Sequence, residues 1–398
     1  MPKPRLIIFF FFFLACNITF AYSQMNSFKM MADYLAESSH RDINIVENNN
    51  VLKIYYWPIG FRDEYQGYVD AKKTVLKYIN QIENNGIESL EFIQTSWGIP
   101  VITTKLYRKN DIKSEVFVKD YHVCEKVQPS LFPARKLLLL FDIPVTMNFG
   151  QPFDPFIFKT GIRPELRLKI CKGVIAYTQI EFYIHNEYDV HEYVYPGSTG
   201  ILLMKTINDN TLTFTNIGIM GTDIYGVDEE INISLYNNLF ALEFHGGIYG
   251  DYEFKNSKFK YYKFDKNLAL LKFLYFNEKY DCVLKFFGGR FLYGDKGVGC
   301  EISRVFNEVE IGFTGIKSGG DIAANVFFSI PFFPKSRRSL AKHGISFKKS
   351  FHCKYWYYSN DLGKEPMLPT SIKSITGYSN PHHFSFMSKF YKNHDNTE

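Results

Sequence analysis

The chain has 398 residues, of which 46% are hydrophobic and 22% are charged, and its formal net charge is +5. A charge this small for the length argues against a dedicated nucleic-acid binder, which would carry a clustered basic face. Aromatic residues make up 18% of the chain. Such a high aromatic content in a chain of ordinary hydrophobicity predicts a protein with one apolar and one polar surface.

The N-terminus has the pattern of a secretory signal peptide over residues 1–24. A basic start precedes an apolar run at 6–15 that is too short to span a membrane, and small and polar residues follow. Cleavage after Ala21 would be ordinary processing. The alternative is a lipoprotein signal at 1–15, which would leave Cys16 as the lipidated first residue of the mature chain.

The other cysteines are scattered, with no close pair. They are Cys124, Cys171, Cys282, Cys300 and Cys353. This spacing predicts neither a disulfide scaffold nor a zinc site. We expect isolated cysteines on apolar faces.

Residues 30–127 are predicted to form a small α/β domain. The segment 51–57 has the composition of a strand, and 65–82 carries apolar residues at helical spacing before an Asn-Asn-Gly stop. Two strands around a Trp-Gly turn are predicted at 87–109. A linker with two prolines follows at 128–136.

After this linker the pattern changes to strands of about ten residues with alternating side chains. Ile231, Ile233 and Leu235 fall on one face of their strand, and polar residues fall on the other. The same alternation recurs over 239–248, 298–304 and 309–315. Short turns between these segments predict antiparallel hairpins.

Two architectures fit an exported chain of hairpins. In a soluble sandwich the apolar face packs a core, whereas in an outer-membrane barrel it meets lipid. Strand length, aromatic clusters at 260–265 and 291–294, and the interior positions of Gly299 and Gly312 favour the barrel. We therefore predict a mainly β protein with an antiparallel transmembrane β-barrel at 137–358.

The predicted barrel has about twelve strands between residues 137 and 333, with a further strand at 346–358. The small domain would lie before it in the chain. A polar tail is predicted at 359–398.

The stretch 288–306 resembles the signature of YjbH-type proteins, in which glycine, arginine and aromatic residues precede a glycine-aspartate pair and a serine-arginine pair. The matching positions are Gly289, Arg290, Gly294, Asp295, Gly297, Ser303 and Arg304. The segment 321–332 is similar to the last signature strand of that family, and 88–101 is similar to its small periplasmic unit. The resemblance covers most of residues 30–365.

This resemblance implies a β-barrel in the outer membrane of a Gram-negative bacterium, with the N-terminal domain in the periplasm. It also implies a role in exopolysaccharide or capsule production, without catalytic residues. The implied partners are outer-membrane lipid, a surface polysaccharide and periplasmic export proteins. The chain differs from typical members in lacking a further N-terminal barrel portion and in a shortened loop at Gly319, Gly320 and Asp321.

The sequence contains no Gly-x-Ser-x-Gly, no His-Glu-x-x-His and no phosphate-binding loop. We therefore predict that the chain is not an enzyme and binds no cofactor or metal. The cluster most like a metal site comprises His185, Asp189, His191 and Glu192. Its spacing fits a polar external loop better than a set of metal ligands.

Five ionisable residues fall on the polar face of their predicted strands: Glu243, His245, Lys285, Glu301 and Glu310. Two interpretations are open. The residues would line a lumen and set its selectivity, or they would pair with one another inside a plugged barrel.

Arg290 and Arg304 lie near strand ends, where they would reach lipid headgroups, and Asp295 is placed to pair with one of them. The basic segment 335–349 is expected to be a solvated loop, and contact with lipid phosphate or an acidic polysaccharide is the alternative. The leading functional hypothesis is a non-catalytic barrel for exopolysaccharide or capsule secretion. The alternatives are a passive porin-like channel and a structural or adhesive surface protein.

Overall fold

The computed structural model describes most of the chain between residues 28 and 358. The described residues are 28–38, 40–61, 64–79, 87–107, 114–118, 137–149, 156–187, 194–208, 210–220, 224–235, 239–255, 258–277, 280–306, 309–318, 321–331, 345–347 and 350–358. Outside these ranges lie the predicted signal peptide with Cys16, Cys124, the linker 128–136, Asp189, His191, Glu192, the loop glycines 319–320, most of the basic segment 335–349 and the tail 359–398. None of the described helices has the length and apolar character needed to cross a membrane.

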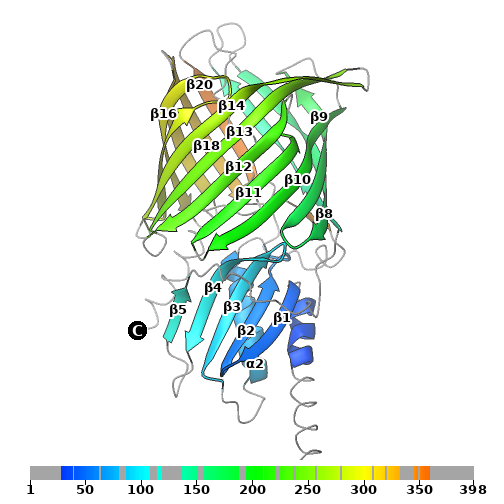
Figure 1. Cartoon of the computed structure of the whole chain (residues 1–398), viewed down its shortest axis with the longest axis vertical. Coiled ribbons are helices and arrows are strands. Elements are labelled where there is room, and N and C mark those ends of the chain that lie inside the picture. Colours follow the sequence, from blue (N-terminus) through cyan, green and yellow to red (C-terminus); the bar gives the residue numbers. More distant parts are fainter. Residues whose placement is uncertain are drawn as a thin grey trace, which may run out of the picture.

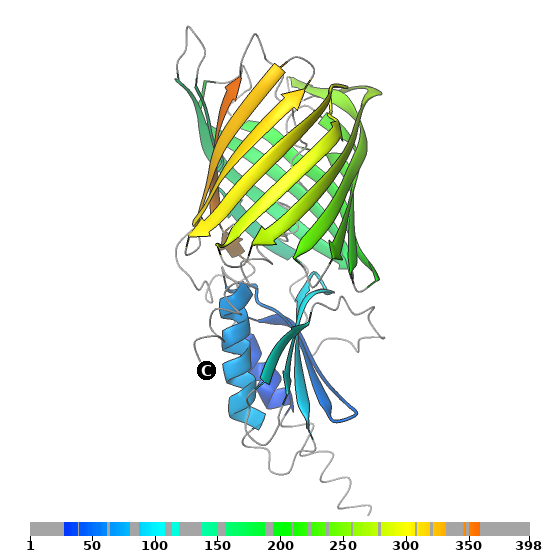
Figure 2. The same cartoon turned by 90° about the vertical axis from the view of Figure 1, so that its left-hand side faces the viewer.

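The N-terminal part of the described chain forms a five-stranded sheet. Its elements are β1 (Arg41–Asn48), β2 (Val51–Trp57), α2 (Glu64–Ile79), β3 (Ser89–Ser96), β4 (Ile99–Tyr107) and β5 (Ser114–Val118), with strands in the order β1-β2-β3-β4-β5. β2 and β3 are parallel and α2 connects them, while the other neighbours are antiparallel. Figure 2 shows α2 covering one face of the sheet, with a further helical segment at 28–37 beside it.

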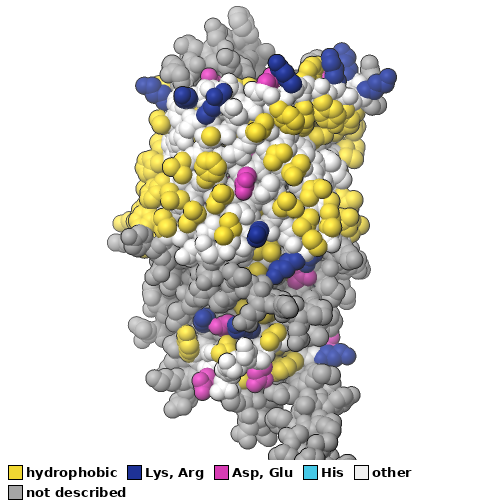
Figure 3. Space-filling model, viewed as in Figure 1, with side chains coloured by type: hydrophobic (Ala, Val, Ile, Leu, Met, Phe, Trp, Pro, Cys, Tyr) yellow, Lys and Arg dark blue, Asp and Glu magenta, His cyan; other side chains and the backbone are white. Residues whose placement is uncertain are grey.

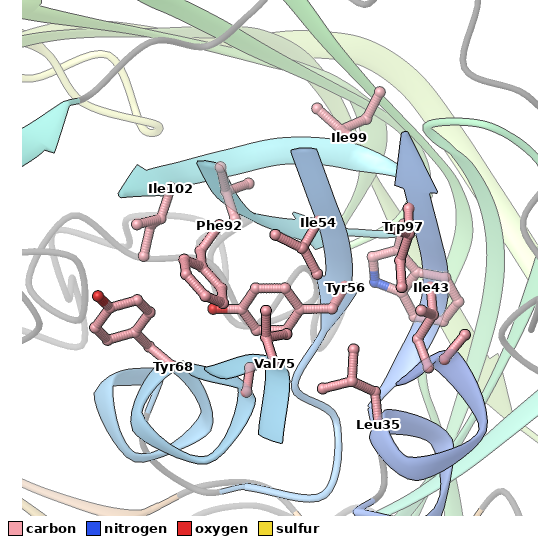
Figure 4. Packing of buried hydrophobic residues seen from close by; sticks show 14 of the residues in the cluster. Leu35, Ile43, Ile54, Tyr56, Tyr68, Val75, Phe92, Trp97, Ile99 and Ile102 are labelled. Atoms are coloured by element: carbon pink, nitrogen blue, oxygen red, sulfur yellow. The ribbon is translucent and has the colours of Figure 1, made fainter. Parts of the chain in front are cut away.

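An apolar core fills the space between this sheet and its helices (Figure 4). Tyr56, Phe92 and Val75 are fully buried there, and the ring of Tyr68 meets Phe92 edge-on with centroids 5.5 Å apart. Each such side chain contributes about 1.5 to 3 kcal/mol when fully buried. β2, α2 and the turn between β3 and β4 lie where the sequence pattern predicts them, whereas β1 and the helical segment 28–37 were not predicted.

The second sheet contains the remaining strands. They are β6 (Leu137–Asp142), β7 (Val145–Phe149), β8 (Phe156–Cys171), β9 (Val174–Asn186), β10 (Val194–Asn208), β11 (Thr211–Ile219), β12 (Ile224–Leu235), β13 (Phe240–Lys255), β14 (Lys258–Asn277), β15 (Cys282–Arg290), β16 (Lys296–Phe306), β17 (Val309–Ser318), β18 (Asp321–Pro331), β19 (Ile345–Phe347) and β20 (Ser350–Tyr358). From β8 to β18 each strand pairs antiparallel with the next. Figures 1 and 2 show this sheet curling into a barrel above the small domain.

The two ends of this sheet meet in a short and irregular seam. β6 and β7 both pair antiparallel with β8, so together they act as one interrupted first strand. β19 pairs with β6 over three residues and β20 with β7 over four, and both pairings are parallel. The antiparallel ladder is therefore not closed directly on itself. Counted this way, the strands up to β18 agree with the predicted number.

The barrel wall has one apolar and one polar face, as the alternation predicts. Val227, Ile231 and Ile233 of β12 point outward, whereas Asp228 and Asn232 point inward and are buried. Figure 3 shows hydrophobic side chains spread over the outer wall, with lysines and arginines along the rim away from the small domain. Exposed Glu229, an outward acid in β12, departs from this pattern.

The two aromatic clusters do not both sit at strand ends as predicted. Residues 260–265 lie inside β14, because β13 and β14 continue past the rim as a long hairpin (Figure 1). Phe291, in the turn between β15 and β16, is buried inside the barrel rather than displayed at its surface. We call the end of the barrel that meets the small domain the domain end, and the opposite end the far end.

Candidate binding site inside and above the barrel

The domain end of the barrel interior is filled by apolar side chains. The turn between β3 and β4 reaches it with Trp97 and Ile99, both buried (Figure 4). The inward barrel residues in the same cluster are Leu138, Leu140, Ile175, Tyr177, Leu202, Met204, Leu212 and Phe214. The core of the small domain therefore continues into the barrel without a polar break.

One backbone hydrogen bond and one ion pair join the small domain to the barrel. The Gly173 N–H donates to the Trp97 carbonyl over 3.2 Å, while the Gly173 carbonyl accepts from the Met204 N–H of the barrel over 2.7 Å and holds the turn in place. Lys169 Nζ lies 2.8 Å from Asp42 Oδ2. Gly173 has a φ of +72°, and an added Cβ would collide with the Met204 carbonyl and press on Ile99. Only glycine suits this position.

Polar side chains of β8 and β9 occupy the next layer of the interior. Glu165 pairs with Arg167 and accepts a hydrogen bond from Gln179 Nε2 over 2.8 Å. Arg163 Nη2 lies 2.8 Å from Glu181 Oε1. All five side chains are largely shielded, and each charge faces an opposite charge, which offsets the cost of burying it.

A second polar layer lies on β12 and β13, and it contains two of the five predicted residues. His245 Nε2 is 2.7 Å from Asp228 Oδ1, to which the Tyr249 hydroxyl also donates. Lys272 Nζ is 3.6 Å from Glu243 Oε2. Asp228 and His245 are each 1% exposed. Asp228 and His245 are therefore shielded from solvent and do not line a water-filled pore.

The other predicted interior residues lie on β15 to β17. Lys285 Nζ donates to Glu301 Oε1 over 2.6 Å, and the Thr314 hydroxyl donates to Glu301 Oε2 over 3.2 Å. Glu310 shares the inward face of β17 with Thr314. The structure thus places all five residues inward: Glu243, His245, Lys285 and Glu301 form the ion pairs given above, and Glu310 lies on the same inner face near Lys285.

Glycines on the inner wall make room for inward aromatic rings. Gly299 is the direct cross-strand partner of Phe287, and Gly312 is the partner of Phe327. A Cβ at either glycine would overlap the opposite ring. The ring instead covers the bare backbone, as aromatic residues do beside glycines in other sheets.

The motif residues of the resemblance serve mainly to shape one turn. Gly294, with a φ of +93°, and Asp295 close the turn after β15, where the Phe291 N–H donates to the Asp295 carbonyl over 2.7 Å. Gly297 leaves space for the Phe291 ring. Gly289 has a φ of +146°, Ser303 is buried on the inner face, and Arg290 is exposed.

The suggested pairing of Asp295 with an arginine is not made among the described residues. Arg304 lies at the opposite end of β16 from Asp295, so the strand length separates them. Its guanidinium instead sits 4.6 Å from the ring centroid of Phe306. The described cysteines, at 171, 282, 300 and 353, are free.

The far end carries a ladder of aromatic rings from β10, β13 and β14, which was not predicted from the sequence. Tyr195 stacks with Tyr252 at 6.5 Å, and Tyr252 meets Phe259 at 5.8 Å and Tyr261 at 6.3 Å. Phe259 and Tyr261 are themselves stacked, with centroids 6.0 Å apart. Phe254 contacts Tyr195 and Phe259. We call these five residues the aromatic ladder.

The ladder runs from a buried to an exposed end. Tyr195 and Tyr252 are buried, whereas Phe259 is exposed and Tyr261 is 54% exposed. Four exposed lysines lie on the same hairpin. Lys263 follows Tyr261 on the face of β14 that carries the rings, whereas Lys255, Lys258 and Lys260 lie on the opposite face. Cross-strand pairing of β13 with β14 brings the rings together. The sequence pattern showed only the aromatic residues of 260–265 and not the rings of β10 and β13 that pack against them.

Glu187 anchors another part of the far end, just after β9. Its carboxylate accepts the Phe158 N–H over 2.8 Å and lies 2.9 Å from His185 Nε2. The backbone N–H, and then His185, lower the pKa of Glu187. Of the cluster that looked most like a metal site in the sequence, only His185 is described, and its neighbour is Glu187. No group of potential metal ligands occurs among the described residues.

Comparison with known proteins gives a distant structural likeness. No family model and no curated protein matches the sequence. A loop L8 deletion mutant of OmpT, an outer membrane protein of Vibrio cholerae, aligns with a TM-score of 0.27 and 7% identity over 48% of this chain and 86% of that chain. In-vitro folded OmpT of the same organism aligns with a TM-score of 0.25 and 5% identity over 48% and 80%. Likeness at this level carries no argument about function.

One expectation is corrected here. The sequence analysis excluded an enzyme, because catalytic motifs are missing and because the YjbH-type resemblance carries no catalytic residues. The matched structures are OmpT chains rather than YjbH-type proteins and give that exclusion no support. The exclusion of an enzymatic activity is therefore withdrawn.

Proposed function

We propose that this chain is an outer-membrane β-barrel protein that binds a surface polysaccharide during its production or export. The small domain would lie in the periplasm and the far end would face outward. The short turns at the domain end, at 172–173 and 280–281, and the long hairpin at the far end fit the asymmetry of outer-membrane barrels. The YjbH-type resemblance supplies the link to exopolysaccharide.

The aromatic ladder is the observation that carries this proposal. Aromatic rings present flat, apolar faces, and sugar rings have apolar C–H faces that pack against them. Phe259 and Tyr261 are exposed and offer ring surface to one chain, and the buried ring of Tyr252 packs against both and holds them in place. The lysines on both faces of this hairpin attract an acidic polymer through their charge. The ladder and the lysines together fit an acidic polysaccharide better than a neutral solute.

The interior argues against the porin-like alternative. Many of its described polar residues, such as Asp228 and His245, pair with one another and are buried, and the domain end is filled by Trp97, Ile99 and their neighbours. A passive channel needs a continuous water-filled path. The protein would instead hold the sugar chain at its far end, and export through the barrel would require the small domain to move. Conductance in a planar bilayer checks this: a steady open pore would favour the porin.

Binding to immobilised alginate, an acidic polysaccharide, tests the proposal directly. We expect Tyr261→Ala to weaken binding about tenfold, which corresponds to about 1.4 kcal/mol. Tyr280→Ala is the matched control, because Tyr280 is similarly exposed, at 52%, but lies at the domain end. Equal binding by both variants would contradict a role for the ladder. A gel shift between boiled and unboiled protein first establishes that each sample holds a folded barrel.

A further inference from the structure

A groove crosses the outward face of the barrel wall near the far end. It has a volume of about 720 Å³ and lies across β15, β16 and β17. Gly288 and Gly315 form its floor, since neither places a side chain outward. A Cβ at Gly315 would meet no heavy atom within 4 Å, so this part of the wall is open.

Cross-strand register explains the shape of the groove. In one row across the strands, Leu271 pairs with Gly288, Gly288 with Val298, and Val298 with Lys317. The next row toward the domain end runs through Phe273, Phe286, Cys300 and Gly315. Because the two glycines lie in adjacent rows on strands either side of β16, the gap is elongated, with large apolar side chains on its flanks.

Three cations stand at the far-end side of this groove. Arg290 and Lys296 are direct partners in the row above Gly288, and Lys317 is in the same row as Gly288. All three side chains are exposed and outward. Within the part of the chain that the structure describes, none of them forms an ion pair. A compact positive cluster thus borders an apolar groove.

We propose that this groove binds one phosphate-bearing lipid of the surrounding membrane. One acyl chain would lie along Gly288 and Gly315, and the phosphate would sit among Arg290, Lys296 and Lys317. Charge complementarity selects the headgroup, because guanidinium and ammonium groups hold phosphate oxygens by charge-assisted hydrogen bonds. Gly288 and Gly315 have no side chains, so an acyl chain can lie closer to the backbone here than elsewhere on the wall. The inference rests on the membrane location proposed above.

The groove differs from ordinary lipid contact along the barrel. Elsewhere on the same strands the outward rows carry full side chains, such as Ile302 and Phe313, which lie side by side in one row. Lipid there meets a ridged surface, and Arg304, in the next outward row of β16, lies over the ring of Phe306 instead of bordering a gap. The site therefore predicts retention of one lipid, rather than a loosely held ring of lipid.

Native mass spectrometry of the full chain in detergent tests the proposal. The probes are phosphatidylglycerol, which is anionic, and phosphatidylcholine with the same acyl chains, which has no net charge. We expect one phosphatidylglycerol to stay bound at collision energies that remove phosphatidylcholine, with at least a tenfold difference in the bound fraction. Equal loss of both lipids would overturn the proposal.

Two sets of variants separate the headgroup from the groove. Replacing Arg290, Lys296 and Lys317 by glutamine should lower phosphatidylglycerol retention to the phosphatidylcholine level. Gly315→Phe should fill the groove and reduce retention of both lipids, without a clash at the backbone. Lys205→Gln is the control, because Lys205 is an exposed lysine on β10, outside the groove. Unchanged retention in the Gly315→Phe variant would show that the groove is not the site.

Folding is checked on the same samples by the gel shift on boiling. Should the triple variant lose this shift, Lys317→Gln alone keeps the test open, because it alters only one exposed side chain. If the parent chain shows no shift, the membrane-barrel proposal itself fails. If it shifts but retains no lipid, only the groove proposal fails.

Discussion

The domain end and the far end of the barrel differ in how their apolar side chains are covered. At the domain end, Trp97 and Ile99 are buried against inward apolar residues of the barrel, and the Gly173 N–H donates to the Trp97 carbonyl across the contact. At the far end, aromatic rings also cluster, but Phe259 and Tyr261 remain exposed among lysines. The first end covers its apolar surface within the chain, and the second leaves part of that surface exposed. Similar residue types thus stabilise the fold at one end, and at the other they form the surface to which we assign the proposed polysaccharide binding.

Substitution of Gly173 should weaken the contact at the domain end and has the largest effect that we expect. An alanine there meets the Met204 carbonyl and must adopt a φ of +72°, so we expect Gly173→Ala to cost about 2 to 4 kcal/mol. Faster proteolysis of the small domain, with the barrel still heat-modifiable, would report its undocking. Gly315→Ala is the matched control, because its Cβ meets open space. Equal protease resistance of both variants would mean that Gly173 does not hold the contact.

Between the two ends, the pairing of Gly299 with the Phe287 ring can be tested by swapping the two residues. Gly299→Phe puts a second ring where Phe287 already lies, and we expect a loss of about 1 to 3 kcal/mol in urea unfolding. The double variant with Phe287→Gly restores one ring and one glycine. It should recover most of the loss. A double variant no more stable than the single one would argue against pairing as the reason for the glycine.

The interior ion pair of Lys285 and Glu301 should show a smaller effect. Lys285→Met leaves Glu301 with Thr314, and partial exposure of both charged groups limits the expected cost to about 1 to 2 kcal/mol. A double-mutant cycle with Glu301→Gln measures the coupling. Additive effects would indicate that the two side chains act separately.

The smallest expected effect concerns Glu187 at the far end. Its pKa is lowered by the Phe158 N–H and His185, so its contribution to stability is present above the unfolded pKa of about 4.3. That contribution is lost as the pH falls through the lower, folded pKa. Carbon-13 NMR of the labelled carboxyl group should give a midpoint below the ordinary value. A midpoint at or above it would mean that the contact is absent in solution.

Sequence periodicity predicted the parts of the fold that depend on neighbours along the chain. The alternation of Ile231, Ile233 and Leu235 with polar residues gave the two faces of β12, and the Trp97-Gly98 turn was placed correctly. The five interior residues were found by the same alternation. Their partners were not, because Asp228 and Lys272 come from other strands whose register a single sequence does not reveal.

Several features missed by sequence reasoning depend on contacts between distant segments. The glycines at 299 and 312 were recognised as interior, but the rings that need them lie on other strands. The docking of Ile99 into the barrel requires two sheets to be placed together. The extent of β14 was also missed, because its charged and aromatic residues carry no clear alternation in the part that projects past the rim.

The seam between the first and last strands has a consequence for how the barrel assembles. Most neighbours in this sheet follow one another along the chain, so each hairpin can form locally. The parallel pairs of β6 with β19 and β7 with β20 join the two ends of the whole sheet, which is the largest loop closure in the molecule. We therefore expect closure to be the last step of folding, and until it occurs two strand edges are open to other chains. A chaperone or insertion machine that shields those edges would act at 137–149 and 345–358.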